Sequence, residues 1–389
     1  MKRFSACLTL ALFLGTAAAF AGGGPLNTLV VVNRASRDSR ALGAYYAEKH
    51  GIPPSHLCSI KTDPRSPCIT RRLFEREIRD PIRAHIANHQ LEGQIHYLVL
   101  CMDIPSRVDN FNGITSVLFY GFKEPTPDAP RCHVASNSVN QYFGAETAYT
   151  SSAGWNLTNA PIPFLLTADS LKTAKAVVDR AVASTASFPE GLFCLHGSAD
   201  PARNIRHRSY PAVARQFALL DRADWLSVQP ASDPVPDRPV LGYMTGRGHL
   251  PTQYVGMVLA PGAIAEHLTS CAGMIPDPCL KQSTVWDWMR LGATASYGTV
   301  SEPCAFREKF PDPMLFYWYS RGFTAGEALA MSVRNPYQGL WVGDPLAAPF
   351  AAPPSVNILA PARHATLSGE TLLKLHVQAH ERGTPPVFV

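Results

Sequence analysis

The sequence predicts an α/β protein whose sheet is mainly parallel and doubly wound, with helices on both faces. Apolar, β-branched segments alternate along the chain with segments of helical periodicity, which is typical of this class. Residues 95–102 are almost continuously apolar, as in strands that are buried on both faces. Residues 292–302 and 341–350 run from small or apolar residues into polar tips. We therefore expect their strands to end at a sheet edge, where ligands tend to bind.

The first third of the chain reads as strand, helix, strand, helix, strand. Ser36 or Asp38 can cap the first helix, Gly51 ends it, and Pro81 should kink the second helix. Residues 109–161 are rich in Asn, Ser, Gly and Pro, and we expect them to form an insertion folded over the sheet. The predicted strands are residues 29–33, 57–62 and 95–102, and the predicted helices are residues 36–50 and 71–89.

The same alternation resumes after the insertion. Residues 255–260 are short and apolar, and the segment AIAEHLTS before Cys271 suits a helix as well as a strand. The predicted strands are residues 164–167, 191–196, 240–245, 295–301 and 340–342, and the predicted helices are residues 170–186, 203–220, 283–290, 313–320 and 325–333.

Three parts are expected from the N-terminus to the C-terminus. Residues 1–21 resemble a secretory signal: Lys2 and Arg3 precede a short apolar run, and Ala19-Phe20-Ala21 fits a cleavage site. Residues 22–350 would form the α/β domain. Residues 351–389 hold two candidate strands, a short β-rich tail or a truncated sandwich domain. We expect export to the periplasm or the exterior, with no transmembrane segment in the mature chain.

Charge and motifs argue against several classes of function. The formal charge of +5 becomes +3 when Lys2 and Arg3 are removed, and it is too scattered to predict nucleic-acid binding. The most basic stretch, residues 203–208, is expected to be a solvated loop. The sequence has no GxGxxG after the first strand, no Walker A motif and no GxSxG elbow, so we expect no cofactor and no ordinary α/β-hydrolase.

Eight of the nine cysteines remain once Cys7 leaves with the signal. Export permits disulfides. The pairs closest in sequence are Cys58/Cys68 and Cys271/Cys279. The sequence does not determine how these four cysteines, Cys132 and Cys304 are paired. Cys101 and Cys194 lie within apolar strand patterns and are expected in the core. No spacing is CxxC, so a structural zinc site is not expected.

Polar residues at strand tips are the candidates for a ligand site. Asp103 and Arg107 would either form an ion pair across a turn or line the crevice beyond the sheet. Glu302 would orient a base, bind a ligand, or cap a loop through backbone N–H groups. Asp344, between Gly and Pro, fits a turn.

The only plausible metal cluster is Asp103, Asp169, His196 and Asp200, and their spacing does not specify a metal.

Several stretches together resemble an uncharacterised family of exported bacterial α/β proteins. They are VVNRASRDSRALGAYYAEKHGIP, IHYLVLCMDIPSR, PGAIAEHLTS, GATASYGTVSEPC, KFP and QGLWVGDPLAAPF. The C-terminal half is also similar to gingipain-type, caspase-like cysteine peptidases. In those proteins one strand ends in a histidine between glycines, a later one ends in a small residue, Cys, any residue and Gly, and a GDP-containing strand can close the domain. The corresponding stretches here are Gly246-Arg247-Gly248-His249, Ser270-Cys271-Ala272-Gly273 and Gly343-Asp344-Pro345, although His249 follows its glycine.

Two functions follow from these observations. One is a non-catalytic or degenerate exported domain with a binding or cell-surface structural role, whose partner would be a cell-surface protein or peptide. The other is a cysteine peptidase in which His249 takes the proton of the Cys271 thiol and the thiolate attacks a carbonyl group. A free thiol at Cys271 would favour the peptidase, and a Cys271–Cys279 disulfide would exclude it.

Overall fold

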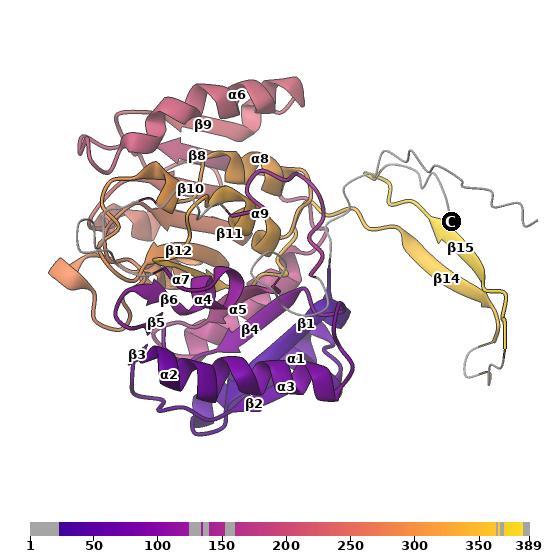
Figure 1. Ribbon diagram of the computed structural model, residues 1–389. Coiled ribbons are helices and arrows are strands. Elements are labelled where there is room, and N and C mark those ends of the chain that lie inside the picture. The colour runs from indigo at the N-terminus through magenta and orange to yellow at the C-terminus, as the bar shows by residue number, and fades with distance from the viewer. Residues whose placement is uncertain are drawn as a thin grey trace, which may run out of the picture.

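The computed structural model describes residues 23–123, 134, 140–151, 160–362, 365 and 369–383. The expected signal, residues 1–21, and Cys132 lie outside the described residues. Ten strands form one sheet in the order β2-β1-β4-β7-β13-β12-β11-β10-β8-β9, with helices on both sides (Figure 1). The predicted α/β class, with its mainly parallel sheet and its short C-terminal β appendage, is confirmed.

The strands of the main sheet are short and almost all buried. Five of them, β4, β7, β10, β12 and β13, are buried at every position. The ten strands are β1 (Thr28–Asn33), β2 (Leu57–Ile60), β4 (Tyr97–Cys101), β7 (Ile162–Leu166), β8 (Leu192–His196), β9 (Leu226–Gln229), β10 (Val240–Thr245), β11 (Leu259–His267), β12 (Ala295–Thr299) and β13 (Gly339–Gly343).

Strand direction fixes which residues meet at each edge of the sheet. Neighbouring strands from β12 to β9 pair in parallel, whereas β13 pairs antiparallel with β12. The backbone N–H of Gly113, beyond β4, donates to Tyr337 O, just before β13 (2.9 Å). Strand β13 therefore begins at the edge where β4 ends, and because β13 is antiparallel to β12, this is also the edge where β12 ends. The edge where β4, β10, β11 and β12 end is called the carboxyl edge below, and the opposite edge the amino edge.

Helices form two layers around this sheet. Tyr243 of β10 contacts Trp288 of α7, while the adjacent Gly242 faces Phe316 of α8, so α7 and α8 lie on opposite faces. Contacts between helices place α1 and α5 with α7, and α6 and α9 with α8. The helices are α1 (Arg37–His50), α2 (Arg71–Phe74), α3 (Asp80–Asn88), α4 (Ile114–Tyr120), α5 (Leu171–Ser184), α6 (Tyr210–Leu219), α7 (Val285–Leu291), α8 (Met314–Ser320) and α9 (Ala325–Ser332).

Local sequence explains where the first helices begin, end and distort. The Ser36 hydroxyl oxygen accepts the N–H of Ser39, and Gly51 ends α1 with a φ of 69°, as expected from the sequence. Before Pro81, residues Glu75–Arg79 widen into a π-helical turn between α2 and α3. Proline lacks an N–H and its ring crowds the carbonyl four residues earlier, which accounts for a distortion at this point.

Two strands of the sheet differ from the sequence-based prediction. Strand β11 extends through residue 267, into the segment AIAEHLTS that the pattern left open between helix and strand. Strand β9 follows the predicted helix 203–220, at a place where no strand was predicted. In β11 the pair Pro261-Gly262 interrupts the apolar pattern, and the register against β10 shifts there. Gly262 has a φ of 87°, which favours glycine and lets the strand continue past the irregularity.

Smaller elements complete the structure. A three-stranded sheet of β3 (Cys68–Ile69), β5 (Arg107–Val108) and β6 (Asn112–Gly113) lies beyond β4. The hairpin of β14 (Ser355–Ala360) and β15 (Lys374–Gln378) projects from the domain (Figure 1). Among the described residues, no helix combines the length and the apolar character needed to cross a membrane.

Candidate functional site

The two candidate catalytic residues follow neighbouring strands. Strands β10 and β11 pair in parallel, with Thr245 opposite His267. His249 and Cys271 each lie four positions beyond this pair, from 245 to 249 and from 267 to 271. The sheet therefore brings both residues to the carboxyl edge on adjacent strands, as the peptidase hypothesis requires.

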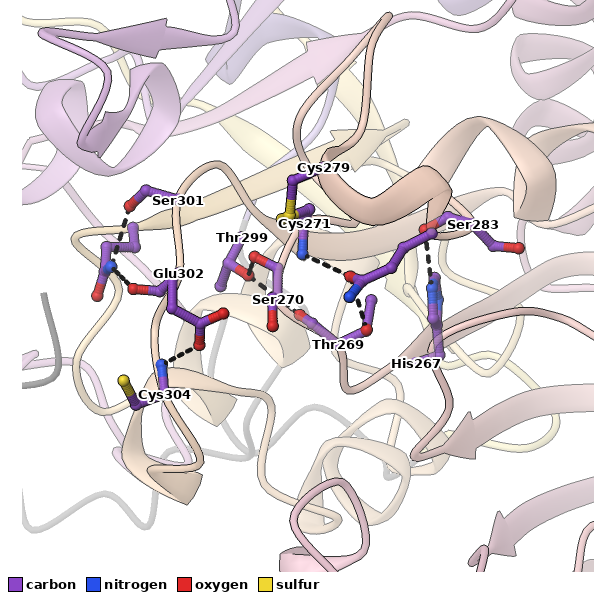
Figure 2. The surroundings of a disulfide bond; sticks show 12 residues. His267, Thr269, Ser270, Cys271, Cys279, Ser283, Thr299, Ser301, Glu302 and Cys304 are labelled. Carbon is purple, nitrogen blue, oxygen red and sulfur yellow. Dashed lines mark hydrogen bonds between the residues drawn. A yellow bond between two sulfur atoms is a disulfide. The ribbon is translucent and has the colours of Figure 1, made fainter. Parts of the chain in front are cut away.

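Cys271 does not carry the free thiol that the hypothesis needs. It is disulfide-bonded to Cys279 and its exposed fraction is 1% (Figure 2). A disulfide sulfur has no proton for a histidine to remove, and it is not a nucleophile. The predicted His249–Cys271 dyad is therefore not present in this structure.

The chain around Cys271 is held by several polar contacts. The side-chain oxygen of Gln282 accepts the backbone N–H of Cys271 (3.1 Å) and the hydroxyl of Thr269 (2.8 Å). The Thr299 hydroxyl, at the end of β12, donates to Ser270 O (2.9 Å) (Figure 2). A Cβ on Gly273 would lie 2.8 Å from Gly298 O, so the two backbones are in close contact. The strand tip is thus fixed by hydrogen bonds and close packing.

His249 is exposed, whereas the histidine built into this part of the fold is His267. The indole N–H of Trp288 donates to His267 Nδ1 (2.9 Å), and His267 Nε2 donates to Ser283 O (3.1 Å). Burial lowers the pKa of His267 to about 4, so the ring is neutral near pH 7. Both ring nitrogens are engaged, which gives His267 a structural role.

The strand-tip candidates beyond β4 and β12 have separate partners. Asp103 accepts the Ser36 hydroxyl (2.5 Å), and Arg107 donates to Asn110 Oδ1 (3.2 Å), in place of the ion pair that was one of their expected roles. Nη1 of Arg107 is buried and has no hydrogen-bond partner among the described residues. Glu302 accepts the backbone N–H of Cys304 (2.7 Å), which is the loop-capping role anticipated for it.

Asp344 lies at the amino edge, away from the other candidates. Because β13 is antiparallel to β12, Gly343 pairs with Ala295, the first residue of β12. Asp344 is fully buried, and it accepts a bond from the Leu346 N–H (3.0 Å), as a turn-forming Asp does. Its other oxygen lies 2.8 Å from Nε2 of His50, the last residue of α1.

The four acidic and histidine candidates for a metal cluster have partners of their own. Asp169 pairs with Arg290, Asp200 pairs with Arg203, and His196 contacts Tyr243 and Ser227. Within the described ranges, no group of three or more His, Cys, Asp or Glu side chains is placed to hold a metal ion.

Of the two cysteine pairs that are closest in sequence, one forms a disulfide and the other does not. Cys271 and Cys279 are joined, and Cys304 is also disulfide-bonded. Cys58, which is buried in the core, and Cys68 are both free thiols. Burial raises the pKa of Cys58 and Cys194 to about 12, which makes these thiols unreactive.

The sequence did not reveal the buried ion pair at the carboxyl edge. Arg206 belongs to the stretch expected to be a solvated loop, but its exposed fraction is 3% and its guanidinium contacts Glu266 Oε1 at 2.5 Å. Arg206 also donates to Thr245 O and Pro311 O. Glu266 is the penultimate residue of β11, so no local pattern indicated that residue 206 would be its partner.

A second missed group surrounds Asp233. Nε and Nη2 of Arg247 both donate to the Asp233 carboxylate, and the Tyr254 hydroxyl also donates to it (2.6 Å). Tyr254 and Tyr243 are hydrogen-bonded through their hydroxyls (3.1 Å), and Tyr243 contacts His196 Nδ1 (3.1 Å). These groups therefore satisfy one another's polar atoms.

An open cavity of about 550 Å³ lies beyond β8 at the same edge. Its wall includes His207, Arg208 and Arg307, together with Phe306 and Glu308. The carboxyl edge therefore offers space and polar groups for binding.

Comparisons with known proteins concern the fold. No protein-family profile matches the sequence, and no curated protein matches it. A solved structure described as "Structure of Protease" shares 10% identity, covers 92% of this chain and 86% of its own, and has a TM-score of 0.49. The complex of Porphyromonas gingivalis RgpB pro- and mature domains shares 11% identity, covers 86% of this chain and 83% of its own, and has a TM-score of 0.43. Membership of the exported family that the sequence resembles stays a prediction.

Proposed function

We propose that this chain is an exported binding domain built on a caspase-like α/β sheet, and that it is not a cysteine peptidase acting through Cys271. The observation that carries this proposal is the Cys271–Cys279 disulfide at the tip of β11. Cys271 is the residue that corresponds to the catalytic cysteine in the resemblance to caspase-like cysteine peptidases, and here its sulfur is bonded to Cys279.

Export is part of the proposal. The first 21 residues have the charged start, short apolar run and small-residue site of a secretory signal. The disulfides at Cys271–Cys279 and at Cys304 support it, because disulfides persist in oxidising compartments and are rare in reducing ones.

The competing function is a cysteine peptidase, and one observation favours it. His249 and Cys271 follow the same register pair of two adjacent parallel strands. A peptidase that is held inactive by the disulfide would need only reduction to expose its thiolate.

Cys279→Ser separates the two functions, because it frees the Cys271 thiol without any reductant. We expect the purified wild type and C279S to leave a mixture of fluorogenic peptides uncleaved, with and without dithiothreitol. The matched control is Cys271→Ser, which breaks the same disulfide but removes the candidate nucleophile.

Cleavage by C279S or by reduced wild type, lost in both C271S and His249→Ala, would overturn the proposal. Thermal unfolding of each variant shows whether it is folded.

A further inference from the structure

A cavity lies at the amino edge of the sheet, opposite Cys271. Its volume is about 760 Å³, within the range of small-molecule sites. Pro25, just before β1, and His50, at the end of α1, line one side. Leu346, Ala348 and residues 350–354, which follow β13, and Arg382, beyond β15, line another.

The charged side chains that line this cavity are all basic. They are Lys49, His50, Arg222, Arg321 and Arg382, and no lining residue among those described carries a carboxylate. Three of them pair with an acidic residue that does not line the cavity: Lys49 with Asp179, His50 with Asp344, and Arg321 with Glu146.

Arg222 and Arg382 differ from these three. Arg222 is half-buried; it donates to Ser320 O (2.6 Å), and its guanidinium lies over the Trp225 ring at 4.6 Å. Arg382 lies over the Phe188 ring at 4.7 Å. Neither forms an ion pair within the described part of the chain. Burial lowers the pKa of Arg222, with no carboxylate to offset it.

The rest of the wall is largely apolar. Val182, Phe188, Leu220, Leu346 and Phe350 line the cavity. Val182 and Leu220 are each 36% exposed, so apolar surface inside the cavity is in contact with water. Covering such surface with an apolar chain is favourable, and a guanidinium fork matches the oxygens of a carboxylate or phosphate.

We propose that this cavity binds an amphipathic anion, a carboxylate or phosphate headgroup on an apolar chain. Arg222 and Arg382 bind the headgroup, and Leu220, Phe188 and Phe350 contact the chain. The proposal rests on the binding role proposed above and gives it a site. Peptidase activity at Cys271 would overturn that role without changing binding here, because Cys271 lies at the other edge of the sheet.

Isothermal titration calorimetry with C12 ligands below their micelle concentrations tests the site. We expect dodecanoate and dodecyl phosphate to bind the full chain at least tenfold more tightly than dodecyl maltoside or dodecyltrimethylammonium. The tighter of the two anions identifies the headgroup. Acetate and inorganic phosphate should not bind, because they lack the chain.

Two neighbouring leucines provide a matched pair of variants. Leu220→Glu places a carboxylate in the cavity and should weaken dodecanoate binding at least tenfold. Leu219→Glu adds the same charge one residue earlier, at a position that is 72% exposed and does not line the cavity, and should leave binding unchanged. Arg222→Met should weaken binding tenfold or more, and Arg222→Lys less.

Equal binding of dodecyl maltoside and dodecanoate would overturn the proposal, as would equal affinity of L220E and L219E. Unfolding temperatures without ligand show whether each variant is folded, which matters for Arg222 because it also holds Ser320 O.

Discussion

At the level of single residues, Arg206 and Glu266 show how far burial can depart from what local sequence indicates. Arg206 stands in the run RNIRHR, whose charge favours solvent, yet it is buried against a carboxylate 60 positions away. Glu266 Oε2 has no hydrogen-bond partner. Burial raises the pKa of Glu266 to about 7, and Arg206 opposes this rise.

Arg206→Met should therefore destabilise the protein more at high pH than at low pH. A carboxyl whose pKa is raised on folding stabilises the fold fully below its unfolded pKa, near 4.5, and that contribution is lost as pH rises through the folded value. Without Arg206 the folded pKa rises further, so the loss at pH 8 grows. We expect the free energy of unfolding to fall by about 3–5 kcal/mol at pH 8 and by less at pH 5, measured by urea denaturation.

Two further variants identify the cause of that effect. The double variant R206M with Glu266→Gln should remove most of the pH dependence, because no buried carboxyl remains to ionise. Arg208→Met, at an exposed position, should change stability by no more than about 0.5 kcal/mol. A loss for R206M that is the same at pH 5 and pH 8 would contradict this assignment.

At the level of secondary structure, strands with an unbroken run of apolar or small residues could be predicted, and β11, whose run is interrupted, could not. Strands β1, β4, β8, β10 and β12 followed directly from their patterns. Strand β11 did not, since Pro261-Gly262 breaks the run and Glu266-His267 looks solvent-facing until Arg206 and Trp288 are known to cover them. The same reasoning predicted Cys271–Cys279 as a close pair but could not choose it over Cys58–Cys68.

The contact between β12 and the loop after β11 predicts the effect of a small substitution. A Cβ on Gly298 would lie 2.5 Å from Gly273 N, whereas a Cβ on Gly256 meets nothing within 4 Å. We expect Gly298→Ala to lower the free energy of unfolding by about 1–3 kcal/mol and Gly256→Ala to change it by about 0.5 kcal/mol or less. Equal stability of the two variants in urea denaturation would show that the strand tip is not packed as described.

At the level of the whole molecule, the two edges of the sheet differ in what they offer a ligand. At the carboxyl edge the candidate nucleophile is disulfide-bonded, and the Asp233 group and His267 satisfy their own polar atoms. At the amino edge an open cavity carries two guanidinium groups that have no carboxylate partner among the described residues. Sequence patterns indicated the carboxyl edge, because they identify strand tips. They missed the amino-edge cavity, because its wall is assembled from segments that only the fold brings together.

The division into an α/β domain of residues 22–350 and a β-rich tail of residues 351–389 stays a prediction. The hairpin of β14 and β15 is largely exposed, including apolar residues such as Val356 and Ile358. Residues from both parts line the amino-edge cavity, so its ligand would contact both.

The most direct test of the central claim is the oxidation state of Cys271 in the secreted protein. Alkylation with iodoacetamide under native, non-reducing conditions, followed by digestion and mass spectrometry, should recover Cys271 and Cys279 in one cross-linked peptide. The half-buried thiol of Cys68 should be alkylated in the same sample, which shows that the reagent works. Alkylated Cys271 at full occupancy, labelled faster than Cys68, would show an activated thiolate and contradict a non-catalytic domain.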